Sequence, residues 1–345
     1  MKKKNVYTVV LAGDVNQTLW PLHRKYQSHD LVSVSADQSL LEQALAVTQS
    51  YVSFENRLVV LSQEQNDTVP VSIKGLASTF LEQPWWKGTA PAFLQACLTL
   101  QESDPEAVVI GIPTDIYLSN PKKCLEFIIH AVDYAAEHSD ITLLGIKAAY
   151  ESTEHSCITY EPSATIPYKI SSYSSLEKTT EKFDHYFGPE DQQDTLWDSG
   201  IVIVQAAAFV DICKQENALL YETVSAYMTG QGSFEDVPEL SLEQAILETT
   251  KQAVILPADF SWCSLRSLES FLAVKNHLSG EQNIVTIDSQ DNLVEVRDSL
   301  VALVGVNNLC VVQSDDVLLV VNRDQLDKVK LVLEMLKQHQ SKEYL

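Results

Sequence analysis

Short apolar runs alternate with longer segments of helical periodicity along the first half of the chain. Runs of strand length lie at 6–11, 57–61, 107–112 and 141–146. Apolar residues recur at helical spacing in 40–48, 89–100 and 122–138. Because helices separate the apolar runs in regular alternation, the pattern predicts an α/β fold with a parallel, doubly wound sheet.

Two of the predicted strands end in residues that suit a ligand site. Gly13 and Asp14 follow the first strand, and Thr114 and Asp115 follow the third. In open α/β sheets, ligands bind beyond the carboxyl ends of the strands. The sequence therefore predicts that the ligand cleft lies at these two strand ends.

The second half of the chain changes character twice. Residues 151–194 are rich in Ser, Thr, Tyr and acids, which predicts short antiparallel strands and loops. Strands are predicted again at 200–204 and 253–256, and helices at 209–227 and 242–250.

A rise in polarity at 275–281 predicts a domain boundary, with one domain at 1–276 and a second at 277–345. Beyond it, short apolar segments separated by turn residues predict a small β-solenoid or β-roll, closed by a helix at 324–338. No strict sequence repeat accompanies this pattern.

Charge and cysteine usage narrow the functional classes. The net charge of −23 disfavours nucleic-acid and membrane-surface partners, because both are anionic. The six cysteines form no C-x-x-C pair and have no His at zinc-ligand spacing, so free thiols are expected. No apolar stretch approaches the ~18 residues of a membrane span, and no signal peptide is recognisable, so a soluble cytoplasmic protein is expected.

Several motifs occur in one order along the chain. Residues 11–24 read LAGDVNQTLWPLHR, 84–92 read PWWKGTAPA, 112–115 read IPTD, and 257–262 read PADFSW. They resemble, respectively, the motifs L-A-G-G-x-G-T-R-L-W-P-L-S-R, P-x-x-R-N-T-A-P-A, L-P-A-D and P-A-D-F-G-W of the mannose-1-phosphate guanylyltransferases, which are sugar nucleotidyltransferases. With weaker matches at 145–147, 177–179, 198–201, 241–245 and 303–316, the resemblance covers about residues 6–335.

The resemblance implies a fold and a reaction. The fold is a Rossmann-like, GT-A-like nucleotidyltransferase domain with a mixed, mostly parallel sheet, followed by a small β-helix-like domain. In the reaction, a sugar-1-phosphate oxygen attacks the α-phosphate of a nucleoside triphosphate and pyrophosphate leaves. Such chemistry depends on positioning two polyanions and on neutralising their charge, and Mg²⁺ is the cofactor that the resemblance implies.

The resemblance also implies which residues form the site. Nucleotide contacts fall on Leu11, Ala12, Gly13, Lys87 and Thr89. Contacts to the sugar and its phosphate fall on Glu177, Lys178 and Asp198, and the first metal ligand is Asp115.

Several positions depart from the family pattern. Thr18 and Ser28 stand where the family has its catalytic Arg and Lys, and Ser264 stands at the second metal ligand. One carboxylate and a hydroxyl predict weak Mg²⁺ binding. The family's second glycine is Asp14, whose carboxylate beside a phosphate about 4 Å away would cost roughly 4 kcal/mol at an effective dielectric near 20.

Three functions follow from this combination. The first is a catalytically silent or strongly impaired homologue that binds a sugar nucleotide or regulates an active paralogue. The alternative is an active enzyme with a rearranged site, which forms GDP-mannose and pyrophosphate from GTP and mannose-1-phosphate; it would need replacement cations from Arg24, Lys25, Lys87 and Lys178. The third is a structural homo-oligomer without a ligand. GTP or GDP-mannose, a second copy and a paralogue are the partners to consider.

Some side chains have a second interpretation. Asp115 also suits a turn or helix cap, and Lys178 a surface lysine. Trp20 and Trp262 suit packing anchors better than ligand platforms. The adjacent Trp85 and Trp86, where the family has small residues, either fill the nucleotide pocket or form an interface patch.

Overall fold

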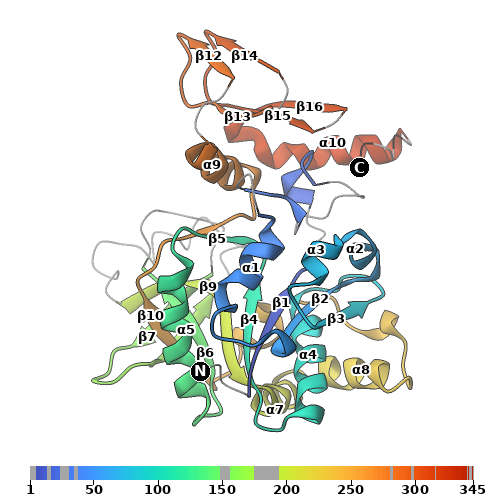
Figure 1. Cartoon of the computed structure of the whole chain (residues 1–345), viewed down its shortest axis with the longest axis vertical. Coiled ribbons are helices and arrows are strands. Elements are labelled where there is room, and N and C mark those ends of the chain that lie inside the picture. Colours follow the sequence, from blue (N-terminus) through green and yellow to red (C-terminus); the bar gives the residue numbers. More distant parts are fainter. Residues whose placement is uncertain are drawn as a thin grey trace. The chain divides into compact units, whose positions relative to one another are not determined.

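The computed structural model describes residues 5–13, 17–23, 31–34, 38–147, 156–174, 194–279, 283–296, 299–314, 316–339, 341 and 344 (Figure 1). Internal contacts divide the chain into two compact units. Unit 1 comprises Met1–Gly13, Leu41–Thr114 and Leu118–Trp262. Unit 2 comprises Asp14–Leu40, Asp115–Tyr117 and Cys263–Leu345. Both units are assembled from several stretches of chain, and the boundary near residue 277 stays a prediction.

A nine-stranded mixed sheet forms unit 1 within the described residues, with strand order β3-β2-β1-β4-β9-β6-β10-β8-β7. Its strands are β1 (Val6–Leu11), β2 (Arg57–Ser62), β3 (Thr79–Gln83), β4 (Val108–Pro113), β6 (Ile141–Ile146), β7 (Cys157–Glu161), β8 (Tyr168–Ser174), β9 (Thr195–Gln205) and β10 (Ala253–Ala258). β1, β2, β3 and β4 are mutually parallel, whereas β9 runs antiparallel to both β4 and β6. The predicted α/β fold with a mixed, mostly parallel sheet is confirmed.

The strand order reverses at β1. β2 and β3 extend the sheet on one side of β1, and the chain then returns to place β4 on the other side. The carboxyl ends of β1 and β4 therefore border a topological switch point, which is where open α/β sheets bind ligands. Leu11 is in register with Val60 and Pro113 there, and Thr114 Oγ1 donates a hydrogen bond to the Leu11 carbonyl at 3.4 Å.

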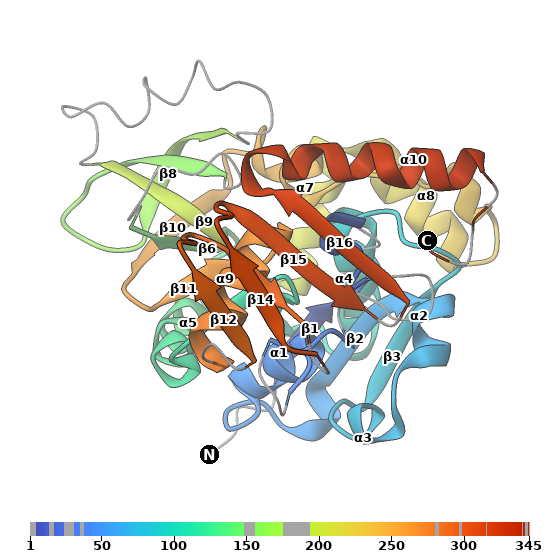
Figure 2. The ribbon, with the colours of Figure 1, turned by 90° about the horizontal axis from the view of Figure 1, so that it is seen from above.

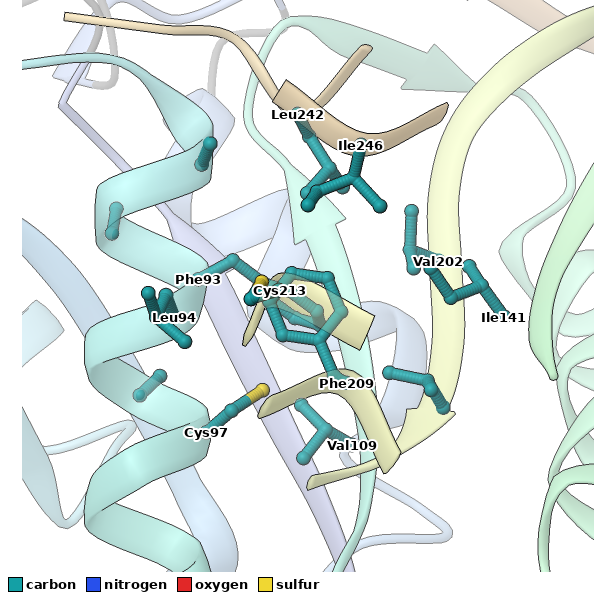
Figure 3. Packing of buried hydrophobic residues seen from close by; sticks show 14 of the residues in the cluster. Phe93, Leu94, Cys97, Val109, Ile141, Val202, Phe209, Cys213, Leu242 and Ile246 are labelled. Carbon is teal, nitrogen blue, oxygen red and sulfur yellow. The ribbon is translucent and has the colours of Figure 1, made fainter. Parts of the chain in front are cut away.

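Helix α4 (Thr89–Ser103) packs on β1 and β2, α7 (Ala206–Glu216) packs on β9, and α8 (Ala218–Met228) packs on these two helices. Pro91 lies in the first turn of α4, where its missing N–H breaks no helical bond. Phe93 and Phe209 meet edge to face with ring centroids 4.8 Å apart (Figure 3). Cys97 and Cys213 lie in the same core, and burial raises the pKa of both thiols, so they behave as apolar side chains.

The remaining helices of the sheet flank its other strands. α1 (Leu40–Thr48) begins in unit 2 and continues into unit 1, and α5 (Pro121–Ala135) packs on β4, β6, β9 and β10. Asn120 caps α5 by accepting a hydrogen bond from Lys123 N, and Pro121 occupies the first helical position.

Several predicted helices have other limits in the structure; the closing helix predicted at 324–338, for example, is α-helical only at Val329–Gln338, after a 3₁₀ segment. The predicted helix at 209–227 is two helices, because Asn217 ends α7 and its side chain caps α8 by accepting from Leu220 N at 3.1 Å. The segment predicted as a helix at 242–250 forms one π-helical turn, Glu243–Leu247. The structure also adds the strand β3 and the short helices α2 (Gln63–Thr68) and α3 (Val71–Lys74), which the pattern did not predict.

Unit 2 contains a short parallel β-helix. β12 (Ile284–Ile287) pairs in parallel with β14 (Val301–Val304), and β13 (Leu293–Glu295) pairs in parallel with β15 (Leu309–Ser314) (Figure 2). The partners Ile284 and Val301 lie 17 residues apart (301 − 284), as do Leu293 and Cys310 (310 − 293). One coil is therefore 17 residues long.

The corners of the β-helix repeat with the same spacing. Asp291 and Asn308 both have left-handed backbones, with φ of 57° and 58°. Asn292 links successive coils, since its Oδ1 accepts from Leu309 N at 3.0 Å and its Nδ2 donates to the Val306 carbonyl at 2.9 Å. The repeat thus lies in the turn geometry and in the hydrogen bonds of the Asn292 side-chain amide. The predicted C-terminal β domain is confirmed, although its sequence shows no obvious repeat.

Unit 2 has its own core. β16 (Val317–Asn322) pairs antiparallel with β15, and a 3₁₀ segment (Arg323–Lys328) leads into α10 (Val329–Gln338). α9 (Leu268–Ser279) packs on β13. Trp20 is buried in this core and its Nε1 donates to the Tyr344 carbonyl at 2.8 Å, so it is a packing anchor. None of the helices among the described residues is long and apolar enough to cross a bilayer.

We expect Gly111→Ala to destabilise the protein by about 1–3 kcal/mol in urea denaturation. A Cβ at Gly111 would lie 2.8 Å from Phe93 Cε2, and Phe93 is fully buried against Phe209, so its ring has little room to move. Gly75→Ala is the matched control, because its new Cβ would lie no closer than 3.4 Å to another heavy atom. Equal unfolding midpoints for the two variants would contradict this account of the core.

Candidate functional site

The residues predicted to bind nucleotide at the end of β1 lie against a tryptophan. Leu11, Ala12 and Gly13 are buried, and Ala12 N donates to the Val60 carbonyl at 2.9 Å. A Cβ placed on Gly13 would lie 1.7 Å from Cε3 of Trp86 and 2.1 Å from its Cζ3. The six-membered ring of the indole therefore rests on the Gly13 backbone, which is a close approach that only glycine permits.

Lys87 is buried and engaged by the protein itself. Its Nζ donates hydrogen bonds to the carbonyls of Glu235 at 2.7 Å and Val237 at 2.5 Å. The ammonium group also lies 5.4 Å from the centre of the Phe234 ring. The Lys87 ammonium group, predicted to contact a nucleotide, thus binds the backbone carbonyls of residues 235 and 237. Its contact with a nucleotide stays a prediction.

The next residues of the segment are tied to the same part of the chain. Thr89 Oγ1 accepts a hydrogen bond from Leu242 N at 2.8 Å. Gly88 has a left-handed φ of 93°, and a Cβ there would lie 2.2 Å from the Leu240 carbonyl oxygen. Trp85 packs edge to face on Phe234, with ring centroids 5.2 Å apart. Residues 85–89 therefore hold the 234–242 segment in place.

Asp198, predicted to bind the sugar, is buried with partners for both carboxylate oxygens. Oδ2 accepts from the Tyr173 hydroxyl at 2.7 Å, and Oδ1 accepts from Gly200 N at 2.8 Å. Burial, together with the charge of Asp198, raises the pKa of Tyr173 well above its ordinary value, so the phenol remains a donor. Trp262 lies close by in the same unit, where its Nε1 donates to the Ser199 carbonyl at 3.1 Å.

Asp115, the predicted metal ligand, is paired with an arginine that the sequence did not single out. Arg266 Nε lies 2.6 Å from Asp115 Oδ2, and the two side chains are 42% and 11% exposed. The backbones support this pair, since Leu265 N donates to the Asp115 carbonyl at 2.7 Å. Ser264 is buried and its Oγ accepts from Arg266 N at 3.4 Å.

These residues do not fit the Mg²⁺ ion that the resemblance implies. Mg²⁺ requires octahedral coordination by hard oxygen ligands, whereas Asp115 is the one carboxylate that the resemblance assigns to the metal, and the Arg266 guanidinium already neutralises it. No group of three or more His, Cys, Asp or Glu residues suited to a metal occurs within the described residues. The sequence signal that could have identified Arg266 is its position two residues after Ser264. It lies just beyond β11 (Trp262–Ser264), which pairs with β5 (Ile116–Leu118).

The other predicted positions are less informative. Thr18 is exposed in the 3₁₀ turn Gln17–Leu19. Ser28, Glu177 and Lys178 lie outside the described residues, as do Arg24 and Lys25.

Two family models match the chain. A model described as nucleotidyl transferase matches residues 7–186, and one described as MannoseP isomerase/GMP-like beta-helix domain matches residues 282–336. The second range contains all the β-helix strands and most of α10.

Curated relatives match over nearly the whole chain at low identity. Mannose-1-phosphate guanylyltransferase RfbM of Salmonella typhimurium is 24% identical, over 97% of this chain and 73% of its own length. Alginate biosynthesis protein AlgA of Pseudomonas aeruginosa is 25% identical, over 94% of this chain and 71% of its own length.

Solved structures share the fold. The structure described as mannose-1-phosphate geranyltransferase from Thermus thermophilus superposes with a TM-score of 0.84 at 21% identity, covering 96% of this chain and 99% of that one. A UDP-glucose pyrophosphorylase in complex with UDP-glucose superposes with a TM-score of 0.54 at 13% identity, covering 82% and 100%.

We expect Arg266→Gln to lower the free energy of unfolding by about 1–2 kcal/mol, because it leaves the Asp115 carboxylate without its cation while solvent screens part of the interaction. Adding Asp115→Asn should recover part of the loss, so the double-mutant cycle should show coupling. Lys123→Gln, which breaks an exposed ion pair with Asp259, is the control and should change stability little. Additive effects of the Asp115 and Arg266 substitutions would contradict the pairing.

We expect Tyr173→Phe to cost about 1–3 kcal/mol of stability at neutral pH, because Asp198 loses a hydrogen bond. The raised pKa of Tyr173 gives the effect a pH dependence. The contribution is fully present below the unfolded tyrosine pKa of about 10 and is lost as pH rises through the higher folded value. The stability difference between wild type and variant should therefore shrink at alkaline pH, and a difference that stays constant to the alkaline limit of folding would refute it.

Proposed function

The chain belongs to the nucleotidyl transferase family, and on that premise we propose that it is a homologue of the mannose-1-phosphate guanylyltransferases whose catalysis is lost or strongly impaired. Its role is then to bind a sugar nucleotide or to regulate an active paralogue. The observation that carries the proposal is the ion pair between Asp115 and Arg266, which supplies an internal cation where the resemblance implies a metal.

The reaction requires positively charged groups that neutralise the phosphates of both substrates. A sugar-1-phosphate oxygen attacks the α-phosphate of a nucleoside triphosphate, so two polyanions must approach each other while pyrophosphate leaves. Thr18 and Ser28 supply no charge where the resemblance implies Arg and Lys. The ammonium group of Lys87 donates hydrogen bonds to two backbone carbonyls. Because each lost donor of this kind typically costs about 10²–10³ in rate, the combined loss supports catalytic silence.

The alternative, an active enzyme that forms GDP-mannose and pyrophosphate, is favoured by the similarity to RfbM over 97% of the chain. It requires that cations elsewhere take over the task. Of the four candidates, Lys87 is the one within the described residues, and it already has partners. The observed contacts therefore support the silent homologue better.

Pyrophosphate release tests the choice. We expect the purified chain with GTP, mannose-1-phosphate and Mg²⁺ to turn over at least ~10⁴-fold more slowly than RfbM assayed in parallel, because the losses of two catalytic cations multiply. Controls without mannose-1-phosphate measure background hydrolysis of GTP. Turnover within about a hundredfold of RfbM would establish the alternative, since two missing cations are incompatible with such a rate.

A further inference from the structure

A tryptophan fills the place beside Gly13 at the switch point of the unit 1 sheet. Three ring atoms of Trp86, Cε3, Cζ3 and Cδ2, lie 1.7 to 2.2 Å from where a Gly13 Cβ would be. The indole also packs against the cluster that contains Leu11, Val60 and α4. A flat bicyclic ring thus lies on the backbone at the strand end where ligands of doubly wound sheets bind.

The shape of the Trp86 indole indicates which ligands fit the position on the Gly13 backbone. An indole and a purine are both planar, bicyclic and heteroaromatic, and both have a π-face that lies well on a flat peptide surface. Gly13 has no side chain, so the backbone surface is open to any such ring. The ring now present is covalently part of the chain, which gives it a high effective concentration over any competitor.

A buried polar side chain with an unpartnered acceptor, Gln83, lies at the carboxyl-end edge of the same sheet. Gln83 is the last residue of β3 and is in register with Ser62 of β2. Ser62 lies two residues beyond Val60, which pairs with Leu11 of β1. Gln83 therefore lies at the same end of the sheet as Gly13. Gln83 Nε2 donates to Gln95 of α4 at 3.1 Å, so the amide faces the helix-covered side. Its Oε1 is buried and has no hydrogen-bond partner among the described residues. A buried acceptor of this kind costs free energy unless a donor meets it, and purine N–H groups are such donors.

We propose that the Trp86 indole occupies a purine-base position on the Gly13 backbone at the end of β1, so that the chain closes its own nucleotide site. The inference rests on the proposed function for the choice of a nucleotide as the ligand. It also separates the two roles left open there, because a closed base position favours a regulatory subunit over a nucleotide-binding one. The wild-type chain is then expected to bind nucleosides very weakly, and removal of the indole should open the position.

Binding of guanosine and of indole to Trp86→Gly tests the proposal, using isothermal titration calorimetry on the full-length chain. Guanosine is chosen over GTP because it has no phosphates to be repelled by the acidic chain, and indole reports the cavity itself. Trp85→Gly is the matched control, since it removes the neighbouring indole, which packs on Phe234 and is 45% exposed. If Trp86→Gly does not fold, Trp86→Leu keeps an aliphatic contact with the core and replaces it in the comparison.

We expect Trp86→Gly to bind guanosine at least ~10-fold more tightly than wild type or Trp85→Gly, and to bind indole as well. Binding of indole without guanosine would overturn the assignment to a purine. Binding of neither ligand by a folded variant, or equal guanosine binding by wild type, would overturn the closure. Pyrophosphate release by wild type would overturn both proposals, whereas failure of the calorimetric test without pyrophosphate release would overturn the closure alone, so the two failures are distinguishable.

Discussion

A buried carboxylate needs hydrogen-bond donors or a cation close to it, and at Asp115 the partner is a guanidinium from the same unit. The pairing of β5 with β11 brings Arg266 to Asp115, and the hydrogen bond from Leu265 N fixes the backbones at that point. Once Arg266 neutralises the carboxylate, a divalent ion has to displace a charge already in place. The fold thereby satisfies the Asp115 carboxylate with a partner from within the same unit.

The same principle recurs in unit 1. Lys87 donates to two carbonyls of the 235–237 segment, and Asp198 accepts from Tyr173 and Gly200. In each case a polar side chain that the resemblance would aim at a substrate holds the protein's own backbone or side chains together. Groups that are satisfied internally stabilise the fold, and they have correspondingly less to offer a transition state.

Much of the architecture was predictable because it depends on local patterns. The helix at Leu40–Thr48 has the predicted limits, and the first four predicted strands all occur. The antiparallel insertion of β9 between β4 and β6 was not predictable, because the apolar run at 200–204 does not encode a strand direction. The 17-residue coil was equally hidden, since its repeat lies in backbone turns and in Asn292.

The candidate site divides in the same way. Residue identity and order alone indicated the family and placed candidate ligand positions at the carboxyl ends of β1 and β4, because these features follow from the sequence pattern. The partners were decided by tertiary structure alone: Arg266 on Asp115, the carbonyls around Lys87, and the Trp86 ring on Gly13. The physical reason is that partners come from residues distant in sequence, so which polar groups remain available for a ligand depends on how the chain folds.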